Sequence, residues 1–331
     1  MSSSQTTSGT VPGRRATSTD GVAAAAPRSS ATRRTSRRGG ATPWLFMAPY
    51  LLLFVGFVVA PVVYGLWISL HDYDYTLPGK PWVGLDNYAK LFSSDSTTAG
   101  PFWQGMRATG IFTLFSVPLL LAVPLAVALL MNSKFKARNL FRALYFAPYV
   151  LGVAVIGVLW TFLLDANIGF VNYYLEKIPG VPENIAWTTS LPWAWIALVG
   201  VTVWWTLGYN AVIYLAGLQD IPRELYEAAK VDHAGRWRRF RHVTLPGLRP
   251  VLVFIVTVTV LASANMFGQA LLITEGAPGN ETRTAIMLIF QEGLRSFRMG
   301  NAAAMSFVLA FFLLVVSIVN FVVFRERKAE A

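Results

Sequence analysis

Residues 227–250, with the sequence EAAKVDHAGRWRRFRHVTLPGLRP, decide the fold of this chain. The stretch is polar and dense in arginine, and long apolar runs lie on both sides of it. Charged side chains at the centre of a lipid bilayer cost free energy, so this stretch is excluded from the membrane interior. The sequence therefore predicts a loop outside the bilayer that joins two membrane-spanning helices.

The composition extends this prediction to the whole chain. Of its 331 residues, 54% are hydrophobic and only 14% are charged, whereas soluble domains carry about 25% charged residues. The apolar residues gather into runs close to the roughly 20 residues that a helix needs to cross the hydrocarbon core. We predict an all-α, polytopic membrane helix bundle with six transmembrane helices, at residues 44–70, 108–132, 146–164, 191–217, 250–274 and 302–324.

The placement of charge predicts the orientation of these helices. With the N-terminus inside the cell, the inner segments hold 21 of the 28 Lys and Arg residues, and the outer loops hold 10 of the 17 carboxylates. This is a positive-inside distribution. It predicts a multi-pass protein of the cell membrane with both termini in the cytoplasm and residues 218–249 as a cytoplasmic loop. The net charge of +11 is thereby assigned to basic residues that anchor the helices at the lipid bilayer, and no nucleic acid partner is predicted.

The two ends of the chain flank a single transmembrane domain, residues 44–325. Residues 1–43 are mainly Ser, Thr, Ala, Gly and Arg, a composition too polar to bury a core, so we expect a disordered cytoplasmic tail. A twin-arginine signal at Arg37-Arg38 is the alternative, but the apolar run that follows is too long for a signal peptide. Residues 326–331 are expected to form a cytoplasmic C-terminal tail.

Features outside the quoted stretch add three local predictions. The outer segments 165–190 and 275–301 are punctuated by Gly and Pro, which predicts short helices between turns. Small residues inside the spans allow helices to approach closely in lipid; these are Gly152, Gly157, Gly200, Gly208 and Ala302 to Ala304. The absence of cysteine excludes disulfides and thiolate metal sites.

The quoted stretch also carries a family resemblance. It opens with Glu227-Ala228-Ala229 and closes near Leu245-Pro246, and this order resembles the EAA signature of permeases of binding-protein-dependent ABC importers. The resemblance implies a type I ABC importer permease fold and a loop that grips an ATPase. It assigns the ATPase-coupling role to Glu227, Ala228, Ala229, Asp232, His233, Gly235, Leu245 and Pro246.

The residues of the loop support this role in physical terms. Residues 222–234 are expected to form a short helix with proline at its start, and small side chains leave Glu227 free to meet a cation on a partner. His233 occupies the position where the family usually has Gly. Either His233 adopts a positive φ or Gly235 makes the bend. The arginines at 236–241 fit either the ATPase or anionic lipid headgroups.

Four further elements resemble the first permease subunit of carbohydrate importers of the maltose and glycerol-phosphate type. They are GLDNY at 84–88, NLFRALYFAPY at 139–149, NIGFVN at 167–172 and ITEGAP at 273–278. The resemblance implies a second permease subunit, two ATPase subunits, an extracytoplasmic solute-binding protein and a sugar substrate. It implies no cofactor in this chain, because the ATPase binds ATP.

Polar residues at membrane depth mark a candidate substrate pathway. The resemblance places sugar contacts at Trp205, Tyr209, Ser263, Asn265 and Met266, and the residues themselves add Gln269, which we expect to share a helix face with Asn265. Amides and aromatic rings suit a neutral di- or oligosaccharide better than an ion. The alternative is that these polar groups only bond neighbouring helices together.

Missing motifs narrow the function further. The chain has no phosphate-binding loop, no catalytic motif and no group of residues with metal-ligand spacing, so neither catalysis nor a metal site is predicted. A stand-alone secondary transporter is the alternative, but its ion coupling normally needs carboxylates in the membrane, and the six predicted spans hold none. A membrane-embedded enzyme needs clustered catalytic groups at one face, which the sequence lacks.

Overall fold

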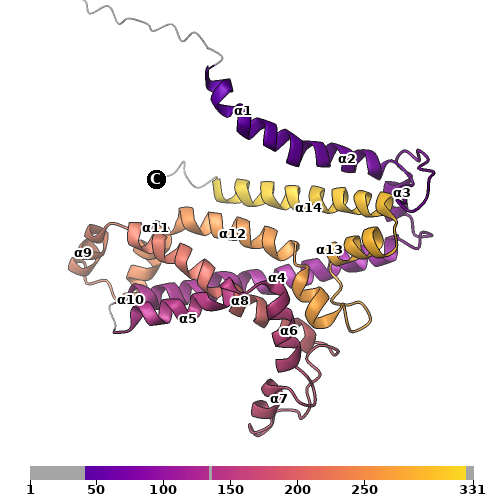
Figure 1. The fold of residues 1–331 in the computed structure, drawn as a ribbon. Coiled ribbons are helices and arrows are strands. Elements are labelled where there is room, and N and C mark those ends of the chain that lie inside the picture. Colours follow the sequence, from indigo (N-terminus) through magenta and orange to yellow (C-terminus); the bar gives the residue numbers. More distant parts are fainter. Residues whose placement is uncertain (1–41, 134–135, 326–331) are drawn as a thin grey trace, which may run out of the picture. The chain divides into compact units, whose positions relative to one another are not determined.

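The computed structural model describes residues 42–133 and 136–325, and this part of the chain is helical (Figure 1). Its only extended pairing is a bridge between His71 and Trp82. The predicted tails at 1–43 and 326–331 lie outside the described residues, apart from the first residues of α1 (Thr42–Phe54). Residues up to Leu53 form one unit, and residues from Phe54 onward form a second, compact unit.

Four helices are long and apolar enough to cross a membrane. They are the run Trp44–Ser69, composed of α1, η1 (Val55–Val59) and α2 (Ala60–Ser69), together with α4 (Ala99–Asn132), α8 (Trp193–Asp220) and the first 24 residues of α14 (Met299–Arg325). Each coincides with a predicted span. Hydropathy therefore located four of the six spans as single helices.

The remaining two spans are bent pairs. The prediction of continuous helices at 146–164 and 250–274 is wrong, because the first is interrupted after Val150 and the second after Ala264. The run Asn139–Val150 of α5 (Arg138–Val150) meets α6 (Val153–Leu163) at 99°. The run Arg236–Gly247, composed of α10 (Arg236–Arg239), η2 (Phe240–Thr244) and α11 (Leu245–Gly247), meets α12 (Arg249–Ala264) at 69°. Counting each pair as one span gives the predicted total of six.

Local chemistry explains where these helices stop. Leu151 ends α5 with an extended backbone, at φ −74° and ψ 135°, and Gly152, at φ −66° and ψ 152°, precedes α6. Asn265 ends α12, where its side-chain amide donates to the carbonyl of Leu261 at 2.8 Å. Helix η3 (Ala270–Thr274) follows only after this interruption. A hydropathy profile does not reveal either break, because apolar residues directly flank each break on both sides.

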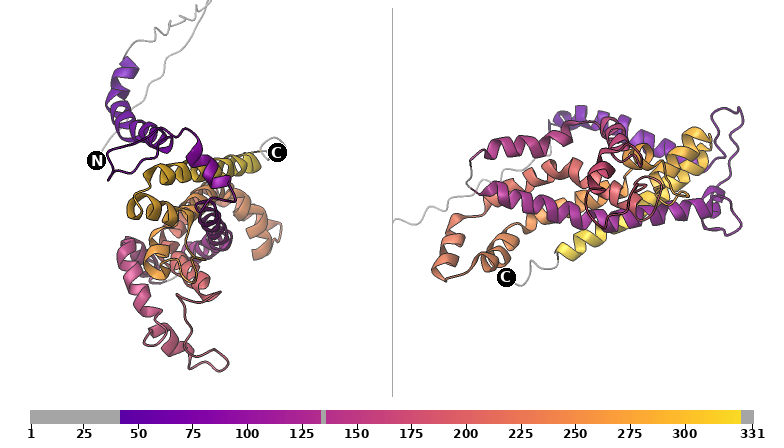
Figure 2. Two further views of the ribbon diagram at one scale, coloured as in Figure 1. Left: turned by 90° about the vertical axis from the view of Figure 1, so that its right-hand side faces the viewer. Right: turned by 90° about the horizontal axis from the view of Figure 1, so that it is seen from below.

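The outer segments 165–190 and 275–301 hold short helices, as predicted. These are α7 (Phe170–Leu175), α13 (Ala285–Phe290) and η4 (Gln291–Arg295). A further short helix, α3 (Asp86–Phe92), lies in the first outer segment, where none was predicted. Figures 1 and 2 show α7 carried away from the bundle at the end of α6. The motif NIGFVN builds this arm: the amide of Asn172 donates to the carbonyls of Ala166 and Ile185, and its oxygen accepts from Trp187.

Asp165 fixes the turn that starts the arm. Its carboxylate accepts hydrogen bonds from the backbone amides of Ile168 and Asn167, at 3.0 and 2.8 Å. These two bonds hold the pKa of Asp165 below its ordinary value, because they stabilise the charged form. The carboxylate therefore stays ionised at neutral pH and supports the turn.

The core of the bundle forms between α4 and α8, which pack along their length. One cluster of buried side chains centres on Phe112 and Leu198, and a second centres on Tyr214 and Ile255 of α12. Pro124 lacks an N–H, so it frees the carbonyl of Leu120 one turn earlier. The side-chain amide of Asn210 donates to that carbonyl at 3.3 Å, which satisfies it inside the bundle.

Two of the predicted small residues, both glycines, permit close contacts between helices. A Cβ added at Gly208 of α8 would lie 2.4 Å from the carbonyl oxygen of Tyr145 in α5. A Cβ added at Gly157 of α6 would lie 2.6 Å from the Leu272 side chain in η3. The prediction is wrong for Gly152 and Gly200, because both face open space.

Candidate functional site

The loop between α8 and α12 carries the EAA signature and is called the signature loop below. It begins with a short helix, α9 (Arg223–Val231), soon after α8. Pro222 precedes it with φ −56° and ψ 135°. At its end, the N–H of Ala234 donates to the carbonyl of Ala229, and the N–H of His233 donates to the carbonyl of Lys230. This pair of bonds is a Schellman motif, which needs a left-handed residue at the position of His233.

His233 supplies this left-handed residue itself, with φ 53°. Of the two alternatives for the bend, the one that uses Gly235 is therefore wrong: Gly235 has φ −64° and begins α10. A residue with a Cβ is strained in this conformation by about 1 kcal/mol, although histidine tolerates it better than most residues.

Replacing His233 by glycine is expected to leave solute uptake intact and to stabilise the loop by up to about 1 kcal/mol. The physical reason is that glycine adopts the same φ without a clash. Uptake in membrane vesicles and the thermal unfolding of the purified protein measure the two effects. Loss of uptake at normal expression would show that the imidazole itself is needed.

The two ends of the loop are fastened together at its base. The hydroxyls of Tyr226 in α9 and Thr244 in η2 are hydrogen-bonded at 3.0 Å. A Cβ added at Gly247 would lie 2.9 Å from the side chain of Ile221, so the chain passes close to its own start. Leu245 and Pro246 lie in α11 at this closure. The loop is therefore a braced unit between α8 and α12.

The exposed side of the loop carries the residues of the signature. Ala228, Ala229 and Asp232 line a groove of about 440 Å³, with Leu225 beside them and Arg238 and Arg239 opposite. Glu227 is exposed and lines a neighbouring hollow with Arg223 and Lys230. None of the ion pairs found in the described part of the chain includes Glu227. Its carboxylate is thus available to a cation on another molecule.

The second candidate site is a cavity of about 460 Å³ inside the bundle. It lies beside the two helix breaks: Tyr149 and Val153 flank the first break, and residues 265–267 form the second. All six residues of the predicted pathway line it, namely Trp205, Tyr209, Ser263, Asn265, Met266 and Gln269. None of the described lining residues is Asp, Glu, Lys, Arg or His.

The two helix breaks, which the sequence did not indicate, bring these residues together. Asn265 and Gln269 do not share a helix face, because α12 ends at Ala264. The carbonyls freed at the breaks are bonded by side chains: the indole N–H of Trp205 donates to Leu151 at 3.1 Å, and the hydroxyl of Thr284 donates to Met266 at 2.8 Å. Satisfied carbonyls keep irregular backbone stable at this depth.

The polar side chains of the cavity divide into two groups. Ser263 is hydrogen-bonded to Ser116 of α4 at 3.1 Å, which supports the alternative that it joins helices. The side-chain amide of Gln269 forms no hydrogen bond with any described residue and lines the cavity. The ring of Tyr209 stacks on that of Tyr149, with centroids 4.8 Å apart and planes at 17°. The cavity thus offers a free amide beside flat aromatic surface.

Sequence reasoning missed three aromatic residues of the cavity, Phe112, Tyr149 and Phe267. Tyr149 closes the motif NLFRALYFAPY, and its place directly before a break was the available signal. Phe267 lies in the interruption after α12, and this interruption is not visible in the hydropathy of the sequence. In the signature loop, the side chain of Val231 is 78% exposed and lies outside the groove.

Comparison with known proteins now identifies the family. Residues 119–327 match the profile of the binding-protein-dependent transport system inner membrane component. This range includes the whole signature loop and every lining residue of the cavity except Phe112. The chain belongs to this family. The protein is therefore a multi-pass permease, a transport component of the membrane and not an enzyme. The family match sets aside the secondary transporter and the membrane enzyme.

Named relatives extend over nearly the whole permease. It is 32% identical to the arabinooligosaccharides transport system permease protein AraP of Bacillus subtilis (strain 168), over 88% of this chain and 90% of AraP. It is also 32% identical to the trehalose/maltose transport system permease protein MalF of Thermococcus litoralis, over 84% of this chain and 92% of MalF. Each of these two alignments covers most of both chains.

A solved structure supports the fold of the permease. A chain from a bacterial ABC transporter involved in the import of the acidic polysaccharide alginate superposes with a TM-score of 0.73. The superposition covers 87% of this permease and 97% of that chain at 22% sequence identity. The predicted ABC importer permease fold is therefore confirmed.

Proposed function

We propose that this permease carries a neutral di- or oligosaccharide into the cell as one subunit of an ATP-driven importer. The observation that carries the proposal is the cavity at the helix breaks, with its free amide, its stacked tyrosines and its uncharged lining. Sugars are bound by hydrogen bonds from amides and hydroxyls and by aromatic rings against their apolar faces. The names of the relatives AraP and MalF agree with such a substrate.

The proposed partners follow from the family. A second permease subunit completes the pathway, two ATPase subunits bind ATP on the cytoplasmic side, and an extracytoplasmic solute-binding protein delivers the sugar. This chain needs no cofactor of its own. Both termini and the signature loop lie in the cytoplasm, in keeping with the positive-inside distribution of Lys and Arg.

The connectivity of the chain supports alternating access. Helix α8 leads directly into α9, and α11 leads directly into α12, so the loop joins the two helices that line the cavity. The hydrogen bond between Tyr226 and Thr244 braces the loop at its base. When ATP closes the ATPase pair, movement of α9 is transmitted to both cavity walls, and the cavity opens to the outer side.

The test of this proposal begins with purification of the tagged permease. We expect the ATPase and a second permease subunit to co-purify, and the reconstituted complex to take up a neutral oligosaccharide when supplied with ATP and the binding protein. Replacing both Asn265 and Gln269 by alanine is expected to lower uptake roughly 10- to 50-fold, because two hydrogen bonds to the sugar, about 1 kcal/mol each, are lost.

The control is the variant Gly200→Ala. It adds a methyl group that faces open space on α8, so it is expected to transport normally. ATPase recruitment is expected to persist in the double variant. The reason is that Asn265 and Gln269 follow the end of α12 that lies away from the loop. Uptake of an oligouronate as fast as the neutral sugar would contradict the proposed substrate class.

A further inference from the structure

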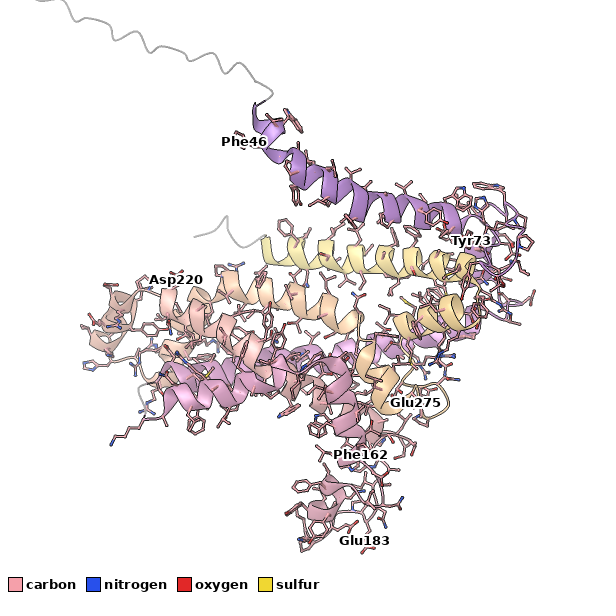
Figure 3. The ribbon with its side chains drawn as sticks, viewed as in Figure 1. Phe46, Tyr73, Phe162, Glu183, Asp220 and Glu275 are labelled. Carbon is pink, nitrogen blue, oxygen red and sulfur yellow. The ribbon has the colours of Figure 1, made fainter. Side chains whose placement is uncertain are left out.

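The segment after the signature helix has an unusual orientation for the start of a membrane span. The run Arg236–Gly247 is bent by 69° from α12. Figure 1 shows α9, α10 and α11 gathered at one end of the bundle, and Figure 3 labels Asp220 at that end and Tyr73 at the opposite end. With α12 crossing the bilayer, this run lies closer to the plane of the membrane surface than to its normal.

This segment concentrates positive charge. Arg236, Arg238, Arg239 and Arg241 fall within six residues. None of the ion pairs found among the described residues includes any of them. Four cations so close together repel one another, so the segment is stabilised by an anionic neighbour.

The arginines divide between two sides of the segment. Arg238 and Arg239 line the groove beside α9, where Asp232 supplies a carboxylate. Arg236 and Arg241 are exposed and lie outside that groove. Between them in the chain is Trp237, which is 72% exposed and stacks on Phe240 with ring centroids 5.5 Å apart. We call Arg236, Trp237 and Arg241 the basic edge.

We propose that the basic edge binds anionic phospholipid headgroups at the inner surface of the membrane. Exposed tryptophan is typical of the boundary between hydrocarbon and headgroups. Arginine pairs with phosphate through two parallel N–H donors, and basic residues at this depth are attracted to an anionic leaflet. The location on the inner side rests on the proposed function, which puts the signature loop in the cytoplasm.

The first experiment counts retained lipid on the whole transporter. The complex is reconstituted in nanodiscs of phosphatidylcholine and phosphatidylglycerol in equal parts, and bound phosphatidylglycerol is measured by native mass spectrometry. The variant R236Q/R241Q is expected to lower phosphatidylglycerol binding about fivefold for each arginine, roughly 25-fold for the pair. The matched control K177Q/R295Q removes the same charge from exposed residues elsewhere and is expected to bind as the native protein does.

The second experiment locates the basic edge directly. The chain contains no cysteine, so Trp237→Cys carries a single fluorophore when the partner subunits are also cysteine-free. Brominated phosphatidylglycerol is expected to quench this label strongly, and to leave unquenched a label at Leu225→Cys in the groove. Equal quenching at both positions, or none at position 237, would overturn the proposal.

The remaining outcomes separate this inference from the proposed function. Unchanged phosphatidylglycerol binding in R236Q/R241Q overturns the lipid site. Loss of the ATPase from R236Q/R241Q would assign the two arginines to an acidic protein surface and also overturns it. Retained ATPase with reduced lipid binding supports the proposal. Failure of the native complex to co-purify with any ATPase would instead contradict the proposed function.

Discussion

The variant Glu227→Ala is expected to lose ATPase recruitment by two to three orders of magnitude while still inserting into the membrane. In the isolated chain Glu227 is exposed and forms none of the ion pairs seen among the described residues. Under the proposed function, docking of the ATPase buries this carboxylate against a cation. Truncating one side of such a pair leaves the other charge buried and unpaired, which costs about 3–5 kcal/mol.

A neighbouring carboxylate provides the control for this prediction. Glu224 is exposed on the same helix and lines neither the groove nor the hollow beside Glu227. Glu224→Ala is therefore expected to recruit the ATPase within about threefold of the native protein. Co-purification from detergent, followed by uptake in vesicles, measures both variants. Equal recruitment by Glu227→Ala and Glu224→Ala would remove the coupling role from Glu227.

The variant Gly208→Val is expected to destabilise the bundle by more than about 3 kcal/mol. The first added carbon already lies 2.4 Å from the carbonyl oxygen of Tyr145 and 2.5 Å from the Cα of Phe146. Both atoms belong to the backbone of α5, so no side-chain rotation relieves the clash. Overpacking of flexible neighbours costs about 1–3 kcal/mol, and a rigid backbone raises this cost because α5 and α8 must separate.

The separation of these helices also affects the cavity. Tyr149 on α5 and Tyr209 on α8 stack beside the contact, so Gly208→Val is expected to reduce uptake as well as the yield of folded protein. Gly200→Val is the matched control, because Gly200 lies on the same helix and faces open space. Thermal unfolding followed by size-exclusion chromatography compares the two. Similar stability of both variants would show that the Tyr145 contact tolerates expansion.

Much of the fold was accessible from the sequence because the bilayer imposes a simple rule on helix length and polarity. The helices α4, α8 and α14 coincide with apolar runs, and the signature motif located α9 between Pro222 and His233. The breaks after Val150 and Ala264 were not accessible. They depend on which side chains satisfy the freed carbonyls, and those partners, Trp205 and Thr284, come from distant parts of the chain.

The candidate cavity shows the same division. Polarity at membrane depth selected Asn265 and Gln269 correctly as neighbours of one space, but the reason offered, a shared helix face, was wrong. Tyr149 escaped notice because a tyrosine near a helix end is ordinary in membrane proteins. The roles of all these residues in sugar binding and ATPase coupling stay predictions until the variants described above are measured.

The uncharged lining of the cavity has a consequence for energetics across the membrane. None of the described lining residues is Asp, Glu, Lys, Arg or His. A charge that crosses the bilayer gains or loses about 2.3 kcal/mol per 100 mV of membrane potential. Under the proposed function, a neutral sugar that passes this wall moves no charge, so the membrane potential neither drives nor opposes this step. The driving force for uptake of the sugar then comes from ATP.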